Sequence, residues 1–258
     1  LGGPRGYGET AMPRYDDGSW EIDVTSIFPN GMNFFGTSYT HFYLNANGSI
    51  TIAGPQSSYT PEAITGITDN PMIAPFFADV MTAYGANAGA PDSNNIWIDF
   101  DEPNGVITIT WDAVQAFGYQ NGETNSFQLR IFSTGDGNFT FEFRYGDINW
   151  TLGTASQGQE AVAGWTDGNG NYYQLPQSGS HDDMADLEHS SNPGTPGDGN
   201  WVFVVSDGQV STRPGLTDSY DLDEADIANG SATVGGTIID NVNWGADGFG
   251  SVTTVTVD

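Results

Sequence analysis

The chain has 258 residues, of which 37% are hydrophobic and 13% aromatic, so it can bury a sizeable core. It carries 33 acidic residues against 5 basic ones, all arginine, and its net charge is −28. Nucleic acid is excluded as a partner and anionic membrane surfaces are disfavoured, because the Lys and Arg side chains that neutralise phosphates are scarce. Such a charge opposes compact folding unless ions screen it, which indicates a saline or calcium-rich exterior.

Other features of the composition bound the location only loosely. There is no cysteine, hence no disulfide and no thiolate metal site. No stretch approaches the roughly 18 consecutive apolar residues of a membrane span, and no signal peptide is present, so membrane insertion is not expected. Because the chain begins at Leu1 rather than Met, we expect it to be processed or to be part of a longer protein.

Strand patterns follow one another along the first 206 residues. Turn-forming residues recur at short intervals and no window keeps a helical period, so the sequence predicts an all-β fold. Phe127, Leu129 and Ile131 alternate with polar residues, as in a half-buried strand. Asn47–Gly48 and Gly135–Asn138 are typical hairpin turns. The predicted strands are Trp20–Val24, His41–Leu44, Ser49–Ile52, Ile96–Phe100, Val106–Trp111, Asn125–Phe132, Asn138–Tyr145, Glu160–Thr166, Tyr172–Leu175 and Asn200–Val205.

The run Pro71–Thr82 (PMIAPFFADVMT) combines two prolines with one carboxylate. Neither Pro71 nor Pro75 can donate a backbone hydrogen bond, so the run should be a kinked strand or a strand entry. Asp79 lies among apolar residues, where a carboxylate must find donors, a cation or a proton. Two interpretations stay open: a structural aspartate that caps backbone amides, and a ligand to a bound cation.

A second candidate cation site is the segment DGNGN. Asp167, Asn169 and Asn171 place oxygen-bearing side chains at alternate positions, a spacing that lets a short loop wrap Ca²⁺. The same residues suit an Asx-Gly turn between two strands, and this alternative remains open.

The character of the chain changes after Ser206, where the aromatic content falls. We interpret residues 207–258 as an acidic linker leading into a partial β module or donor strand. Calcium bound by the linker would stiffen it, and a disordered hinge is the alternative. The candidate calcium ligands there are Asp218, Asp221, Asp223 and Asp226.

No residue is assigned a catalytic role. Asp99 and Asp101 share one face of a predicted strand, but no histidine or aromatic sugar platform is predicted beside them. The segment His181–His189 gathers imidazoles and carboxylates that would suit a transition metal, yet without a spacing motif a solvated acidic loop is the preferred interpretation.

Five segments, taken in order, resemble the nidogen-like, or NIDO, extracellular domain. The resemblance covers Met12–Val205 and implies a β-sandwich-like domain at residues 1–206 with a short C-terminal β segment. It also implies an extracellular or cell-surface location, and adhesion or matrix assembly rather than chemistry. The segments are Asn33–Tyr43 (NFFGTSYTHFY), Leu44–Ile50 (LNANGSI), Pro71–Thr82, Asn125–Leu129 (NSFQL) and Phe143–Thr151 (FRYGDINWT).

This chain departs from the family at one position of interest. The family often has a second acidic residue two places after the aspartate of Pro71–Thr82, and here that residue is Met81. The departure favours Asp79 as an amide-satisfied structural group. It moves the calcium prediction to Asp167–Asn171 and to the acidic run after Ser206.

The tail Asn241–Val257 resembles modules of large bacterial repetitive (RTX-type) adhesins exported by type I secretion, which are acidic, cysteine-free and calcium-loaded. Together the two resemblances imply a secreted bacterial adhesion or matrix module with Ca²⁺ as cofactor. Its expected partners are extracellular matrix, a surface glycan or protein ligand, or copies of itself. Two alternatives stay open: a filament subunit whose strand Ser251–Val257 pairs with a neighbour, and a glycan-binding surface domain.

Overall fold

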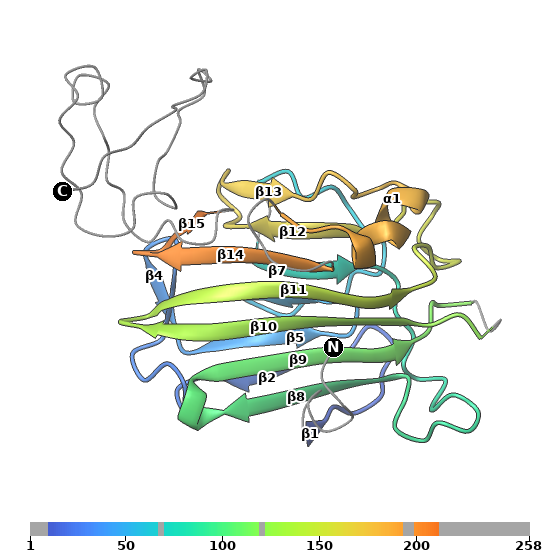
Figure 1. Ribbon diagram of the computed structural model, residues 1–258, viewed down its shortest axis with the longest axis horizontal. Coiled ribbons are helices and arrows are strands. Elements are labelled where there is room, and N and C mark those ends of the chain that lie inside the picture. The colour runs from blue at the N-terminus through green and yellow to red at the C-terminus, as the bar shows by residue number, and fades with distance from the viewer. Residues whose placement is uncertain (1–9, 67–69, 119–121, 193–198, 212–258) are drawn as a thin grey trace, which may run out of the picture.

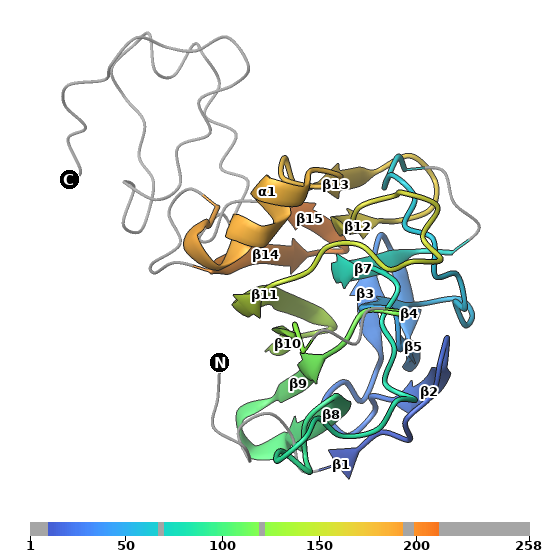
Figure 2. The same cartoon turned by 90° about the vertical axis from the view of Figure 1, so that its right-hand side faces the viewer.

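The computed structural model describes residues 10–66, 70–118, 122–192 and 199–211. Within them, two antiparallel sheets face each other, a third sheet has two strands, and there is one short α-helix (Figures 1 and 2). The predicted all-β, sandwich-like fold is confirmed. In this described part, no helix has the length and apolar character needed to cross a membrane.

The larger sheet has seven strands in the order β1-β8-β9-β10-β11-β14-β15. Its centre is the long hairpin of β10 and β11, in which Leu129 pairs with Phe143 and Ile131 with Phe141. All four side chains are fully buried, because alternate residues of both strands face the second sheet. The strands are β1 (Thr10–Ala11), β8 (Asn95–Asp101), β9 (Val106–Val114), β10 (Asn125–Gly135), β11 (Asn138–Ile148), β14 (Asn200–Ser206) and β15 (Gln209–Ser211).

The second sheet has six strands in the order β13-β12-β7-β6-β5-β2, and β3 pairs with β4 separately. The predicted Asn47–Gly48 turn connects β5 to β6, whose residues Leu44 and Ile50 pair across the hairpin. The strands are β2 (Ser19–Asp23), β5 (His41–Asn45), β6 (Ser49–Thr51), β7 (Met72–Phe77), β12 (Val162–Thr166) and β13 (Tyr172–Gln174), with β3 (Met32–Phe34) and β4 (Thr37–Tyr39).

Strand β7 is a central strand that contains a proline. Its pairing with β6 ends at Ile73, and its pairing with β12 shifts register between Val162 and Gly164, opposite Pro75. The missing N–H of Pro75 therefore falls where neither ladder is regular. The run predicted as a kinked strand or a strand entry thus contains a strand, Met72–Phe77, whose ladder is irregular at Pro75.

Aromatic side chains fill the space between the two large sheets. Trp111 stacks on Phe127 at 5.0 Å between ring centroids, and Phe76 from the facing sheet lies 5.1 Å from Phe127. The buried Tyr145 hydroxyl donates to the Pro75 carbonyl at 2.6 Å, which links the two sheets directly. Each such aromatic contributes about 2–3 kcal/mol through burial. Figure 2 shows the two layers that this core joins.

All ten predicted strands are present, but several short elements were not predicted. The strands β1, β3, β4 and β15 have two or three residues each, too few to show a period. The segment predicted as a solvated acidic loop is helical, because Met184 and Leu187 turn into the core. The helical elements are η1 (Glu102–Asn104), α1 (His181–Ala185) and η2 (Asp186–His189).

Candidate functional site

The chain that follows β7 carries Asp79 along the interior of the fold. Asn47 fixes this segment twice: its carbonyl oxygen accepts from Ala78 N at 3.2 Å, and its side-chain oxygen accepts from Val80 N at 2.9 Å. The Asp79 carbonyl accepts from Phe117 N at 2.9 Å. The Asp79 side chain is 1% exposed, so the predicted burial of this carboxylate is confirmed.

Residues 15–17, between β1 and β2, bring two further carboxylates to the same place. Asp16 forms an isolated antiparallel bridge with Met81. The Thr82 hydroxyl accepts from Tyr15 N at 3.0 Å and donates to Tyr15 O at 2.8 Å. Asp17 accepts from Asn47 Nδ2 at 2.7 Å, so one Asn47 side chain holds both residues 15–17 and the segment that follows β7.

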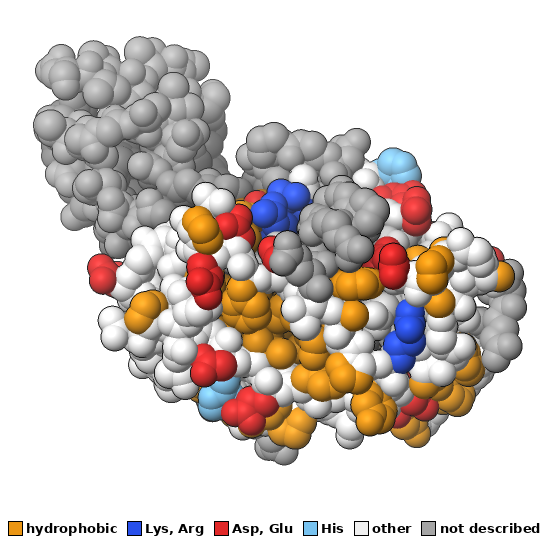
Figure 3. Space-filling model, turned by 90° about the horizontal axis from the view of Figure 1, so that it is seen from below, with side chains coloured by type: hydrophobic (Ala, Val, Ile, Leu, Met, Phe, Trp, Pro, Cys, Tyr) orange, Lys and Arg blue, Asp and Glu red, His pale blue; other side chains and the backbone are white. Residues whose placement is uncertain are grey.

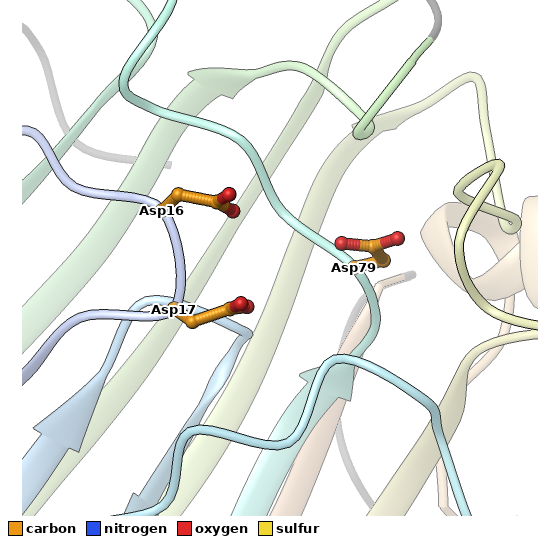
Figure 4. A group of neighbouring side chains, drawn as sticks. All are labelled: Asp16, Asp17 and Asp79. Atoms are coloured by element: carbon orange, nitrogen blue, oxygen red, sulfur yellow. The ribbon is translucent and has the colours of Figure 1, made fainter.

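The three aspartates form a compact group. One carboxylate oxygen of each of Asp16, Asp17 and Asp79 lies within 4.8 Å of the others. Figure 4 shows the carboxylates of Asp16 and Asp17 pointing toward that of Asp79. Asp16 is exposed and Asp17 half-buried, so the group leads from the surface to a buried end. Among the described residues, no other group of three His, Cys, Asp or Glu side chains converges in this way.

The electrostatics of the group are unfavourable without a counter-ion. Burial, then repulsion from Asp17 and Asp16, raises the pKa of Asp79 from 3.8 to about 6, although Ala155 N–H and the Ser156 hydroxyl act in the opposite direction. Burial and the neighbouring Asp17 also raise the pKa of Asp16. Asp79 Oδ2 has no hydrogen-bond partner. The expectation that backbone amides satisfy Asp79 stays a prediction: Ala155 N–H favours its charged form, whereas Oδ2 has no partner.

No cationic side chain of the described part compensates these charges. The ion pairs found there involve other acidic residues. Arg14 is near in sequence, but its guanidinium donates to the carbonyls of Asn94 at 3.2 Å and Ser93 at 3.0 Å. Carboxylates gathered in this way are the ligands that Ca²⁺ prefers, so cation binding is the chemistry for which the group is suited.

The other candidate loop is organised by hydrogen bonds. Asp167 Oδ1 accepts from Asn169 N at 2.7 Å and Asn171 N at 2.9 Å, and Oδ2 accepts from Asn171 Nδ2 at 2.6 Å. Burial raises the pKa of Asp167, but these hydrogen-bond donors together outweigh burial and lower the pKa below its usual value. This is the geometry of the Asx-Gly turn, the alternative interpretation of the segment. Calcium at Asp167, Asn169 and Asn171 stays a prediction.

The remaining predicted ligands Asp218, Asp221, Asp223 and Asp226 lie outside the described residues, as does the tail that resembles repetitive adhesins. In the segment His181–His189, His181 Nδ1 lies 2.6 Å from the Thr151 hydroxyl, and His189 pairs with Asp186 at 3.2 Å on the surface.

Asp16 and Asp17 were missed by the sequence reasoning. They precede Gly18 in what reads as an ordinary acidic turn, and more than sixty residues separate them from Asp79. The bridge between Asp16 and Met81 brings them together, and no spacing rule reports such a contact. The position that lacks a second acidic residue thus lies beside two carboxylates from another part of the chain.

Comparisons with known proteins identify the domain. Residues 92–207 match the family model of the nidogen-like domain, NIDO. Mouse alpha-tectorin is 30% identical over 235 residues, which cover 81% of this chain and 10% of alpha-tectorin. Dendrite extension defective protein 1 of Caenorhabditis elegans is 28% identical (81% of this chain, 19% of that protein), and Drosophila melanogaster nidogen is 28% identical (68% and 14%). No solved structure matches.

The chain thus spans about a tenth of the length of alpha-tectorin and less than a fifth of the other two relatives. Alpha-tectorin and nidogen are extracellular matrix proteins, so the predicted extracellular or cell-surface location is confirmed. The described sandwich, the family match and these relatives agree. The chain therefore contains a nidogen-like domain and is related to alpha-tectorin and nidogen.

Proposed function

We propose that this chain is a non-enzymatic extracellular module for cell–matrix or cell-surface adhesion, stabilised by calcium. The observation that carries the proposal is the similarity to extracellular matrix proteins over 81% of the chain. The relatives that share the domain are matrix proteins without enzymatic activity, which supports a binding role rather than catalysis.

The surface supports a binding role. Figure 3 views the molecule from the edge that carries β1 and β8, where apolar side chains gather in the middle of the face with acidic side chains around them. Tyr15 is 57% exposed, and its ring lies 6.4 Å from that of Trp20. Exposed tyrosines and exposed apolar patches are both typical of protein-binding sites.

Calcium belongs to the proposal because of the charge of the chain. A net charge of −28 with no lysine is a load that divalent cations relieve. A secreted bacterial source is also part of the proposal, supported by the absence of cysteine and by the resemblance of Asn241–Val257 to repetitive adhesins.

The adhesive role is tested by coating beads with the purified chain and measuring their retention on a basement-membrane extract. Beads coated with heat-denatured chain are the control. We expect saturable retention that soluble native chain competes away. Retention equal to that of the control beads at every coating density would exclude the adhesive role. Repeating the measurement in calcium and in chelator separates adhesion from its cation dependence.

An open polar groove favours glycan binding as a second candidate function. The groove has a volume of about 640 Å³ and is lined in part by Tyr59, Glu62, Gln157 and Gln159. A 40% exposed tyrosine among amide and carboxylate groups suits a sugar ring, which stacks on an aromatic face and hydrogen-bonds at its rim. A glycan array probed with wild type and Tyr59→Ser tests this role, and a blank array at high protein concentration rejects it.

Self-assembly through the C-terminal strand remains a further alternative. It is supported by the alternation of Ser251–Val257, which lies outside the described residues. If it is correct, deletion of residues 251–258 abolishes filaments seen by electron microscopy and leaves the monomer folded. Filaments that persist after the deletion exclude this mode of assembly.

A further inference from the structure

We propose that Asp16, Asp17 and Asp79 together bind one hard divalent cation of the calcium class, which ties residues 15–17 to the chain that follows β7. The inference deepens the calcium part of the proposed function and rests on it, but it does not depend on the identity of any adhesion ligand. It places the ion at a site different from Asp167–Asn171 and from the acidic run after Ser206.

The spacing of the three oxygens fits one shared ion. Calcium binds carboxylate oxygens at about 2.3–2.6 Å, so two ligands of one ion are separated by at most about 5 Å. The three oxygens lie within 4.8 Å of one another without rearrangement of the chain. Figure 4 shows that the carboxylates approach one another from two separate segments of the chain.

The unpartnered buried oxygen of Asp79 is a second and independent observation. Surface carboxylates cluster often without binding anything, because water solvates them. Asp79 is 1% exposed and its Oδ2 has no hydrogen-bond partner, so water does not provide that solvation. A buried carboxylate in this state needs a cation or a proton. One oxygen of the same carboxylate lies within 4.8 Å of an oxygen of Asp16 and of Asp17, and Figure 4 shows the three carboxylates gathered together.

Backbone contacts hold the site in place. Asn47 binds Asp17 through its amide nitrogen and Val80 N through its amide oxygen, so one buried side chain sets the spacing between the two segments. Behind Asp79, a Cβ placed on Gly153 would lie 2.6 Å from Oδ2, so only glycine fits against this carboxylate. The ligands are therefore positioned before the ion arrives, which favours affinity.

Calcium binding by the chelator-treated full chain tests the proposal, measured by isothermal titration calorimetry and by thermal unfolding. The variants are Asp79→Asn and the double variant Asp16→Asn/Asp17→Asn. The matched control, Asp182→Asn/Asp183→Asn, removes two exposed charges from α1 and so reports unspecific attraction to an acidic protein. Terbium luminescence adds a readout at the site itself, because Tyr15 and Trp20 lie beside Asp16 in the chain and can sensitise the bound ion.

We expect one tight site in the wild type and the control, and an affinity at least about ten-fold lower in both site variants, because each loses anionic ligands. In both site variants, calcium should no longer raise the unfolding midpoint, and the sensitised terbium signal should be lost. Equal calcium affinities in the site variants and the control would overturn the proposal. So would a wild-type unfolding midpoint that does not rise when calcium is added.

Two further outcomes keep the result decisive. If Asp79→Asn does not fold, the double variant decides, because Asp16 is exposed and Asp17 half-buried. A further variant, Asp167→Asn, tests the other loop: if calcium binding is lost only in this variant, the ion belongs to that loop and the proposal is rejected. The retention of coated beads on matrix is measured separately. If the beads are retained but no cation binds at Asp79, only the cation site is rejected. If a cation binds at Asp79 but the beads are not retained, only the adhesive role is rejected.

Discussion

Replacing Asp79 by asparagine should stabilise the protein when divalent cations are removed. Burial, then repulsion from Asp17 and Asp16, raises the pKa of Asp79 from 3.8 to about 6. A rise of about two pH units, at about 1.4 kcal/mol per unit, means that the folded state disfavours the charged form by roughly 3 kcal/mol. Asparagine has nearly the same shape and no charge, but its amide must still find partners. We therefore expect a gain of about 1–3 kcal/mol in the free energy of unfolding at pH 7.5.

The sign of the pH dependence follows from the same shift. Between pH 3.8 and about 6 the folded chain keeps a proton on Asp79 that the unfolded chain has released. The free energy of unfolding of the wild type therefore falls as the pH rises through this window, whereas the variant lacks this contribution. The advantage of Asp79→Asn should be absent below pH 3.8 and largest above about pH 6.

Urea unfolding in EDTA, followed by tryptophan fluorescence at several pH values, measures this difference. Asp182→Asn on the exposed face of α1 is the control for general charge reduction. Saturating calcium should remove or reverse the advantage, because the ion stabilises only the chain that keeps the carboxylate. A variant less stable than the wild type in EDTA at pH 7.5 would show that the fold favours the charged form, and would refute this account of Asp79.

Other predictions concern contacts that hold the sandwich. Gly48→Ala should lower the free energy of unfolding by about 3 kcal/mol or more, because a Cβ at this position (φ +80°) would lie 1.8 Å from the Phe76 carbonyl oxygen. Gly36→Ala is the control: its φ is +81° but the space around it is open, so the loss should be about 1 kcal/mol. Equal losses in chemical denaturation would contradict the clash. Tyr145→Phe should cost about 1–2 kcal/mol by removing the buried hydrogen bond to the Pro75 carbonyl, and an unchanged urea midpoint would show that the bond contributes nothing. Asp167→Ala should lower the free energy of unfolding by about 1–2 kcal/mol at neutral pH. The pKa of Asp167 is lowered in the folded chain, so the difference between variant and wild type should shrink as the pH falls below 3.8. A difference that does not change with pH would exclude a stabilising carboxylate.

The sequence predicts the long elements well because their burial follows a simple period. The alternation along β10 and β11 reports which side chains face the second sheet. Of the five tryptophans in predicted strands, Trp20 is partly buried and the other four are buried: Trp97, Trp111, Trp165 and Trp201. Even the proline in β7 was informative, since its missing donor required an irregular ladder. Strands of two or three residues are too short to show an alternating pattern. The helix α1 is too short to show a helical hydrophobic period, and its acidic residues are equally typical of a loop.

The candidate site was predicted only in part for a different reason. Asp79 could be singled out because a carboxylate inside an apolar run conflicts with its surroundings. Its partners are set by topology: Asp16 reaches Met81 through one backbone bridge and Asp17 is held by Asn47. The local spacing around position 81 therefore gives no sign of these carboxylates, which come from another segment of the chain.

The strand order has a mechanical consequence. β1 and β15, the first and last strands of the described part, lie at opposite edges of one sheet. Tension drawn through both would load the edges of that sheet and not its central hairpin. β1 offers only two residues of pairing with β8, so it would yield first. Further along the chain, after the hydrogen bonds of Met12, Arg14 and Tyr15, comes the bridge of Asp16 to Met81, where a bound ion would resist further peeling. The acidic group thus lies just inside the edge that such tension would open first.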